Sequence, residues 1–113
     1  MTQSQSKPPS SKTISKEYQR LPPQAIELEE AVLGACMLEK DALPKIINWL
    51  NPESFYTDIN SHIFTAIKQV HARSEPVDIL TVTQELKRIG KLQIVGGPYH
   101  VTTLTNRVGS SEN

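Results

Sequence analysis

The residues of this sequence that could hold a metal ion or act as a nucleophile are few and far apart. Cysteine occurs once, as Cys36, and histidine three times, as His62, His71 and His100. His62 and His71 are nine residues apart, which places them on opposite sides of a helix, so we expect no shared metal ion. Cys36 lies in an apolar segment that disfavours a thiolate, and we interpret it as a buried small hydrophobic residue.

A nucleotide-binding loop is also missing from the sequence. The pattern Gly-x-x-x-x-Gly-Lys-Ser/Thr does not occur, and the Gly96-Gly97 pair is too short for that role and is typical of a turn. Asp58 and Asp78 each precede a segment of helical periodicity, where a helix N-cap explains them better than a general base does. We therefore predict no catalytic, cofactor-binding or metal-binding residues in this chain.

With catalysis and metal binding disfavoured, we consider protein binding. The candidate partner-binding residues are Trp49, Tyr56, Tyr99 and His100. Aromatic side chains carry much of the energy of protein interfaces. For Trp49 and Tyr56 the alternative is packing in or beside the core, which we favour. Tyr99 and His100 follow the Gly96-Gly97 turn, and we expect this turn and the exposed side of its helix to be available to a partner.

Composition divides the 113 residues into two parts. Residues 1–20 have a net charge of +3 and only Ile14 as a large aliphatic residue, so they cannot offset the entropy of folding, and we predict a disordered tail. The remainder has a net charge of −3 and no basic stripe, which argues against tight DNA binding by a folded domain. With neither a secretory signal nor an apolar run of about 18 residues, we expect no membrane span and a cytoplasmic location.

Apolar periodicity predicts helices throughout the folded part, from about Leu21 to Val108. The first runs from Ala25, with Gly34 allowing a close approach by a neighbour. Asp41 is predicted to cap the second helix, Asp58 or Asn60 the third, and Asp78 the fourth, which ends at Gly90. The last helix follows Gly97, although its β-branched residues would also fit a strand. The residues expected to face inward are Leu28, Val32, Ala35 and Cys36 (widened by Ile26, Leu33 and Met37), Leu43, Ile46, Ile47 and Leu50, Ile63, Phe64, Ile67, Val70 and His71, Ile79, Val82, Leu86 and Ile89, and Val101, Leu104 and Val108.

The sequence thus predicts an all-α, compact bundle of five or six short helices. Phe55 and Tyr56 are expected to form an aromatic plug between the second and third of these helices. Glu27 and Glu30 are expected to face water. Because we expect the apolar stripe of every helix to pack into the core, we expect no long apolar seam on the surface.

Four short motifs, in order, resemble the amino-terminal domain of replicative DNA helicases of the DnaB family. They are LPPQAIELE with AVLG (residues 21–34), FY with HIF (55–64), PVD with LT and Leu86 (76–86), and GG (96–97) with the closing SSEN (110–113). Helix caps and core positions explain each residue, but not the order of the motifs. His100 and Val101 depart from the family, which commonly has Tyr and Leu there.

The resemblance implies that residues 21–113 are the helical head of a helicase whose hairpin, linker and ATPase motor are absent from this chain. Such a helicase is a homohexamer that encircles single-stranded DNA and uses ATP and Mg²⁺ to unwind the replication fork. Its heads form a collar, a trimer of dimers, that supports ring assembly and primase recruitment. The isolated head would be non-catalytic and is expected to form at most a weak dimer, because the hairpin contact is missing.

Two other functions stay open at this point. The chain could be a free-standing helical adaptor, such as a helicase loader or a primase-binding protein, or a small enzyme with an unrecognised site. A phosphate-binding loop encoded downstream of Asn113 would favour the helicase.

Overall fold

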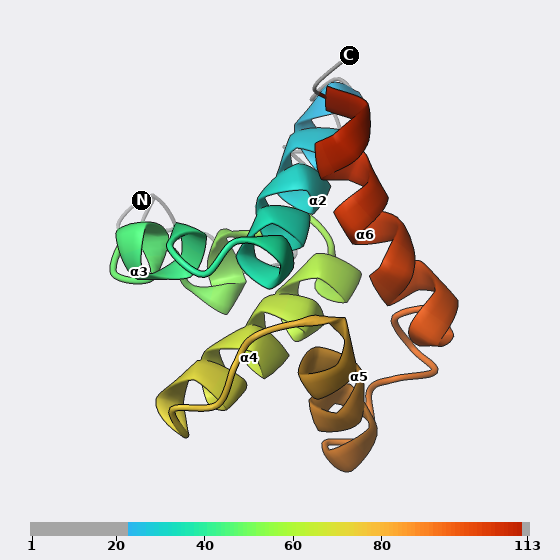
Figure 1. The fold of residues 1–113 in the computed structure, drawn as a ribbon. Helices are drawn as coiled ribbons and strands as arrows, with labels where there is room; N and C mark the ends of the chain where they lie inside the picture. Colours follow the sequence, from blue (N-terminus) through green and yellow to red (C-terminus); the bar gives the residue numbers. More distant parts are fainter. Residues whose placement is uncertain (1–22, 112–113) are drawn as a thin grey trace, which may run out of the picture.

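The computed structural model describes residues 23–111, and every regular element among them is helical (Figure 1). The elements are α2 (Pro23–Leu38), α3 (Ala42–Ile46), the 3-10 turn η2 (Pro52–Ser54), α4 (Asp58–Ala72), α5 (Ile79–Arg88) and α6 (Gly97–Ser111). This confirms the all-α bundle, including a helix rather than a strand at the end of the chain. The predicted disordered tail, residues 1–20, lies outside the described residues.

Helices α2 and α6, far apart in sequence, lie side by side (Figure 1). Gly34 makes this possible, as predicted, because a Cβ atom at that position would lie 2.0 Å from the backbone oxygen of Leu104. An ion pair between Arg107 Nε and Glu30 Oε1, 2.9 Å long, joins the same two helices. Glu30 is therefore largely covered, and the prediction that it faces water was wrong.

The inward face predicted for α2 was also wrong in part. Leu33, Cys36 and Met37 are buried in the core, but Leu28 is 66% exposed and Val32 37% exposed. The helix is apolar on nearly all sides, so periodicity could not select its inner face; the close contact at Gly34 does. The helix also begins at Pro23, two residues earlier than predicted, since proline is well accepted in a first helical turn.

The short helix α3 and the turn after it cover one end of the core. Leu43 is buried, and Ile46, Ile47 and Leu50 pack against the core as predicted. Asp41 occupies the N-cap position but makes no side-chain capping hydrogen bond. The helix is only five residues long, and its stability therefore comes from apolar packing rather than from a cap.

Helix α4 is the central element of the core, with Ile63, Phe64, Ile67 and Val70 buried. The N-cap is Thr57, whose Oγ1 accepts a hydrogen bond from the Asn60 amide at 3.1 Å. Neither predicted cap was correct, because Asp58 and Asn60 are already helical residues. His71, predicted to face inward, is exposed.

The predicted aromatic plug before α4 is half correct. Phe55 is buried and its ring centroid lies 5.0 Å from that of Phe64, whereas Tyr56 is only half-buried. The Glu29 carboxylate on α2 holds this link, accepting hydrogen bonds from the Tyr56 amide at 2.8 and 3.1 Å and from Asn60 Nδ2 at 3.1 Å. A charged group thus ties the start of α4 to α2.

Helix α5 begins as the sequence predicted. Asp78 Oδ1 accepts from the Thr81 amide at 2.8 Å while Thr81 Oγ1 accepts from the Asp78 amide at 3.0 Å, a reciprocal capping box. Gly90 follows the end of the helix. The core of the described residues comprises Leu33, Cys36, Met37, Leu43, Phe55, Ile63, Phe64, Ala66, Ile67, Val82, Leu86, Val95, Val101 and Leu104. No helix in residues 23–111 is long and apolar enough to cross a membrane.

Candidate protein-interaction surfaces

Trp49 lies on the surface, in the turn that follows α3. Its side chain is 81% exposed, so the interpretation that it packs in or beside the core was wrong. The Trp49 amide donates to the Ile46 carbonyl oxygen at 2.8 Å, which fixes the backbone of the turn. The indole is therefore presented to solvent from an ordered position, as an interface anchor would be.

Tyr56 belongs to the framework rather than to an open surface. Its side chain is half-buried, as the core-packing interpretation predicted. Its amide donates to the Glu29 carboxylate. A change at Tyr56 would therefore disturb the link that starts α4 as well as any partner contact.

Tyr99 lies in the first turn of α6 and is 80% exposed. The preceding turn needs glycine, because Gly96 and Gly97 have φ angles of +105° and +78°. Ile94, in the same link, is 56% exposed. Ile94 and Tyr99 are thus two exposed apolar side chains within five residues of each other in the sequence.

His100 is half-buried beside Gly96, and among the described residues its buried Nε2 atom has no hydrogen-bond partner. The first turn of α6 and helix α3 lie at opposite sides of the molecule (Figure 1). The four predicted residues therefore do not form one site. The structure instead presents two separate exposed aromatic side chains, Trp49 and Tyr99.

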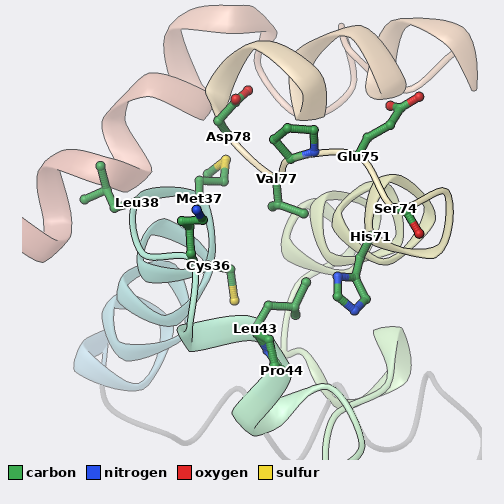
Figure 2. A pocket seen from close by; sticks show the side chains of 12 residues that line it. Cys36, Met37, Leu38, Leu43, Pro44, His71, Ser74, Glu75, Val77 and Asp78 are labelled. Carbon is green, nitrogen blue, oxygen red and sulfur yellow. The ribbon is translucent and has the colours of Figure 1, made fainter.

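A groove of about 630 Å³ lies between the end of α2, α3 and the α4–α5 link (Figure 2). Met37, Leu43 and Val77 contribute apolar side chains, while His71 and Glu75 add polar ones. Sequence reasoning missed this groove, since its walls come from three elements that only the fold brings together.

The only cysteine also lines this groove, but its environment disfavours a nucleophilic role. Cys36 is 2% exposed, and burial raises the pKa of its thiol to about 11. The thiol is therefore protonated at neutral pH, in agreement with the interpretation of Cys36 as a small hydrophobic residue. Within residues 23–111, no three His, Cys, Asp or Glu side chains are grouped so as to hold a metal ion.

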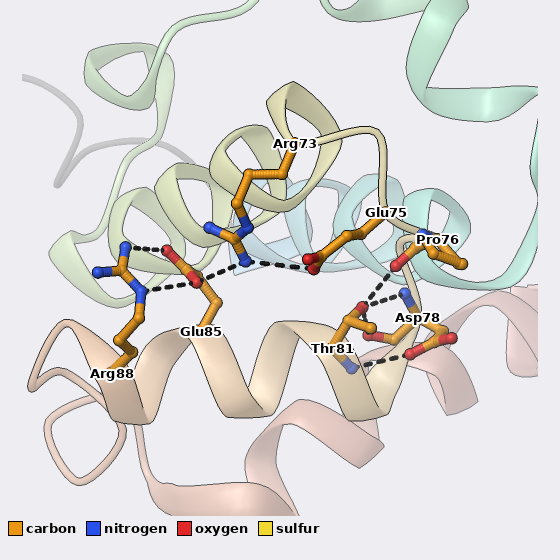
Figure 3. A network of polar contacts seen from close by, with 7 residues as sticks. All are labelled: Arg73, Glu75, Pro76, Asp78, Thr81, Glu85 and Arg88. Carbon is orange, nitrogen blue, oxygen red and sulfur yellow. Dashed lines mark hydrogen bonds and ion pairs between the residues drawn. The ribbon is translucent and has the colours of Figure 1, made fainter.

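Glu85 is a buried charged residue that sequence reasoning missed (Figure 3). Its side chain is 1% exposed and pairs with Arg88 at 2.6 Å and with Arg73 at 2.9 Å. Hydrogen bonds from Arg88 and Arg73 lower the pKa of Glu85 to about 2. The i,i+3 spacing of Glu85 and Arg88 indicates that these two side chains can pair. It indicates neither the contact with Arg73 nor the burial of Glu85. The network joins α5 to the end of α4 and is structural.

The carboxylates of Asp78, Glu29 and Glu85 thus act as a cap, a tie between helices and an ion-pair partner within an all-helical domain. Residues 21–113 match the model of the DnaB-like helicase N terminal domain. The chain therefore belongs to the DnaB-like helicase N-terminal domain family, as its sequence motifs suggested.

Individual relatives agree with this assignment. The chain is 46% identical over 94 residues to the replicative DNA helicase DnaB of Rhodothermus marinus, covering 83% of this chain and 10% of that protein. It is 43% identical over 94 residues to the replicative DNA helicase DnaC of Bacillus subtilis, covering 83% and 21%. The chain thus spans between a tenth and about a fifth of the length of these relatives.

The fold is similar to the crystal structure of the N-terminal domain of DnaB helicase from Mycobacterium tuberculosis. The TM-score is 0.72 at 38% sequence identity, over 77% of this chain and 60% of that one. This likeness confirms the predicted fold class from a solved structure.

Proposed function

We propose that this chain is the collar and protein-interaction domain of a hexameric replicative DNA helicase, supporting ring assembly and primase recruitment at the replication fork. Family membership over residues 21–113 supports the helicase assignment. The relatives carry the name replicative DNA helicase and are five to ten times longer than the matched segment. In this proposal, ATP and Mg²⁺ bind to a motor domain outside this sequence, and the work is done in the cytoplasm on single-stranded DNA held by the ring.

The chain itself acts by contact and not by catalysis. Asp78 caps a helix, Glu85 pairs with two arginines, and the Cys36 thiol is buried and protonated. The observation that carries the proposal is that a domain of this family presents Tyr99, 80% exposed, on the first turn of a helix packed along α2. Aromatic side chains held in this way lose little entropy on binding and are typical anchors of interfaces.

Primase binding by single-residue variants tests the proposal. Primase from the same organism is titrated by calorimetry into the 113-residue chain, and Tyr99→Ala and Trp49→Ala are compared with it. We expect at least one of the two variants to weaken binding about tenfold or more, the range of interface anchors. Leu80→Ala, at a leucine 64% exposed on α5, is the control and is expected to change the affinity little. Primase binding that is absent, or equal for all four chains, would contradict a recruiting role for these surfaces.

A further inference from the structure

Residues 39–50, the segment that contains α3, are attached to the rest of the domain by aliphatic side chains. Leu43 is buried, and Ile46, Ile47 and Leu50 are partly buried against the core. Within residues 23–111, no side chain of this segment makes a hydrogen bond or an ion pair. Its backbone hydrogen bonds stay within the segment or return to the last turn of α2, as that from the Glu39 amide does.

The longer helices are held together by polar contacts that this segment lacks. The Glu29 carboxylate ties α2 to the start of α4, Arg107 pairs with Glu30 between α6 and α2, and Glu85 pairs with Arg73 between α5 and α4. A helix as short as α3 is marginal without tertiary contacts. Segments with few buried contacts are those that open locally at a lower free energy than the whole domain.

Both ends of the segment are fixed, which limits how much of the chain can move. On one side Met37, near the end of α2, is buried in the core. On the other side the Asn51 amide donates to Ser54 Oγ at 3.1 Å, and Phe55 packs on Phe64 with 5.0 Å between the ring centroids. A local opening would therefore be confined to residues 39–50.

The segment forms one wall of the groove that Cys36 lines (Figure 2). Leu43 and Pro44 come from α3, while Val77 comes from the α4–α5 link on another side. Cys36 is only 2% exposed and belongs to the same core cluster as Leu43. Displacement of α3 would therefore open the groove and expose the thiol.

We propose that residues 39–50 form a flap that opens as a unit while α2, α4, α5 and α6 stay folded, and that each opening exposes Cys36 and the apolar wall of the groove. The hinges lie at the two ends of the flap, before residue 39 and after residue 50. Trp49 lies in the flap, so a partner that holds its indole would shift the opening equilibrium. The inference goes beyond the proposed function, because it concerns a motion of the folded chain that needs no primase.

Alkylation of Cys36 by iodoacetamide in the 113-residue chain tests the flap. The rate is measured at constant pH in urea concentrations below the unfolding transition. We expect a rate about tenfold or more above that calculated from global unfolding, since local opening needs less free energy. The rate should hardly change with urea, because opening a short segment exposes little surface. Amide exchange at Ile47 and Trp49, which donate within the flap, should show the same shallow dependence on urea.

Two matched variants separate opening of the flap from unfolding of the domain. Leu43→Ala removes the one fully packed leucine of the flap and should speed the alkylation of Cys36 about thirtyfold or more. Leu86→Ala is the same change at a leucine that is 0% exposed on α5. It should lower global stability and leave the alkylation rate in water unchanged. Gly90→Ala, a milder change outside the flap, serves the same purpose if Leu86→Ala does not fold.

Several results would overturn the inference. An alkylation rate that rises steeply from the first addition of urea would mean that only complete unfolding exposes Cys36. The same conclusion would follow if Leu86→Ala or Gly90→Ala raised the rate as much as it raises the global unfolding constant. A Leu43→Ala chain that reacts no faster than wild type, or Ile47 and Trp49 amides that open at different free energies, would also refute a flap that moves as a unit. None of these results bears on primase binding, so the proposed function is tested separately.

Discussion

Replacing Gly34 by alanine is the sharpest test of the packing between α2 and α6. A Cβ atom there would lie 2.0 Å from the oxygen and 2.7 Å from the carbonyl carbon of Leu104, both in the backbone of α6. Contacts shorter than 3.0 Å are essentially never seen for a real Cβ atom, so the helices must separate by about 1 Å. No rotamer change relieves this clash, because backbone atoms cause it.

The expected free-energy change is the balance of two opposing effects. Alanine is favoured over glycine within a helix by about 1 kcal/mol. Overpacking of a well-packed contact costs about 1–3 kcal/mol, and displacement of a whole helix belongs to the upper end of that range. We therefore expect Gly34→Ala to lower the free energy of unfolding by about 2 kcal/mol, which for a domain of this size lowers Tm by roughly 8–16 °C.

Thermal and urea unfolding, followed by far-ultraviolet circular dichroism, measure this change. The control is Gly90→Ala, at a position where an added Cβ meets nothing within 4 Å but the φ angle is +77°. It should cost only about 1 kcal/mol, through backbone strain. Helix propensity alone predicts the opposite sign for Gly34→Ala. A stabilised variant, or one less destabilised than Gly90→Ala, would refute the close contact between α2 and α6.

Four further predictions concern polar groups and nucleotide binding. Since ion pairing lowers the pKa of Glu85 from 4.5 to about 2, its contribution to stability should be full above pH 4.5 and lost as the pH falls through about 2; Glu85→Gln should remove this part of the pH dependence in acid unfolding curves. Asp78→Ala should lower the free energy of unfolding by about 1 kcal/mol, as measured in urea, because α5 loses its N-cap; an unchanged value would mean that the cap is dispensable. Cys36 should react with iodoacetamide much more slowly than free cysteine at pH 8 and at full rate in denaturant, and equal rates would contradict its burial. Calorimetric titration of the chain with Mg-ATP should show no micromolar binding, since the sequence has no phosphate-binding loop.

The parts of the fold that the sequence predicted are those encoded within a few residues. The Asp78 cap of α5 is an example, because the aspartate and the amide it accepts from are three residues apart. The close approach at Gly34 was predictable for a different reason. A glycine inside an otherwise apolar helix costs stability, and a neighbour that needs the space explains why it is there.

The parts that were missed depend on contacts between distant segments. The choice of Thr57 over Asp58 as the cap of α4 depends on where the chain leaves the extended link, which Glu29 fixes from 27 residues away. The burial of Glu85 depends on Arg73, twelve residues earlier on α4's C-terminal turn. Local sequence shows neither relation.

The exposure of the candidate surface residues likewise depends on contacts between distant segments and not on local sequence. Aromatic type alone could not tell Trp49, at 81% exposure, from the buried Phe55, since both lie between helices and both suit a core. Exposure is decided by whether a neighbouring element covers the side chain. On α2, both sides are apolar enough to be covered, and only the Gly34 contact shows which side the domain itself uses. The opposite side is as aliphatic as the inner one, yet the described residues leave it open, with Leu28 66% exposed and Leu38 53% exposed.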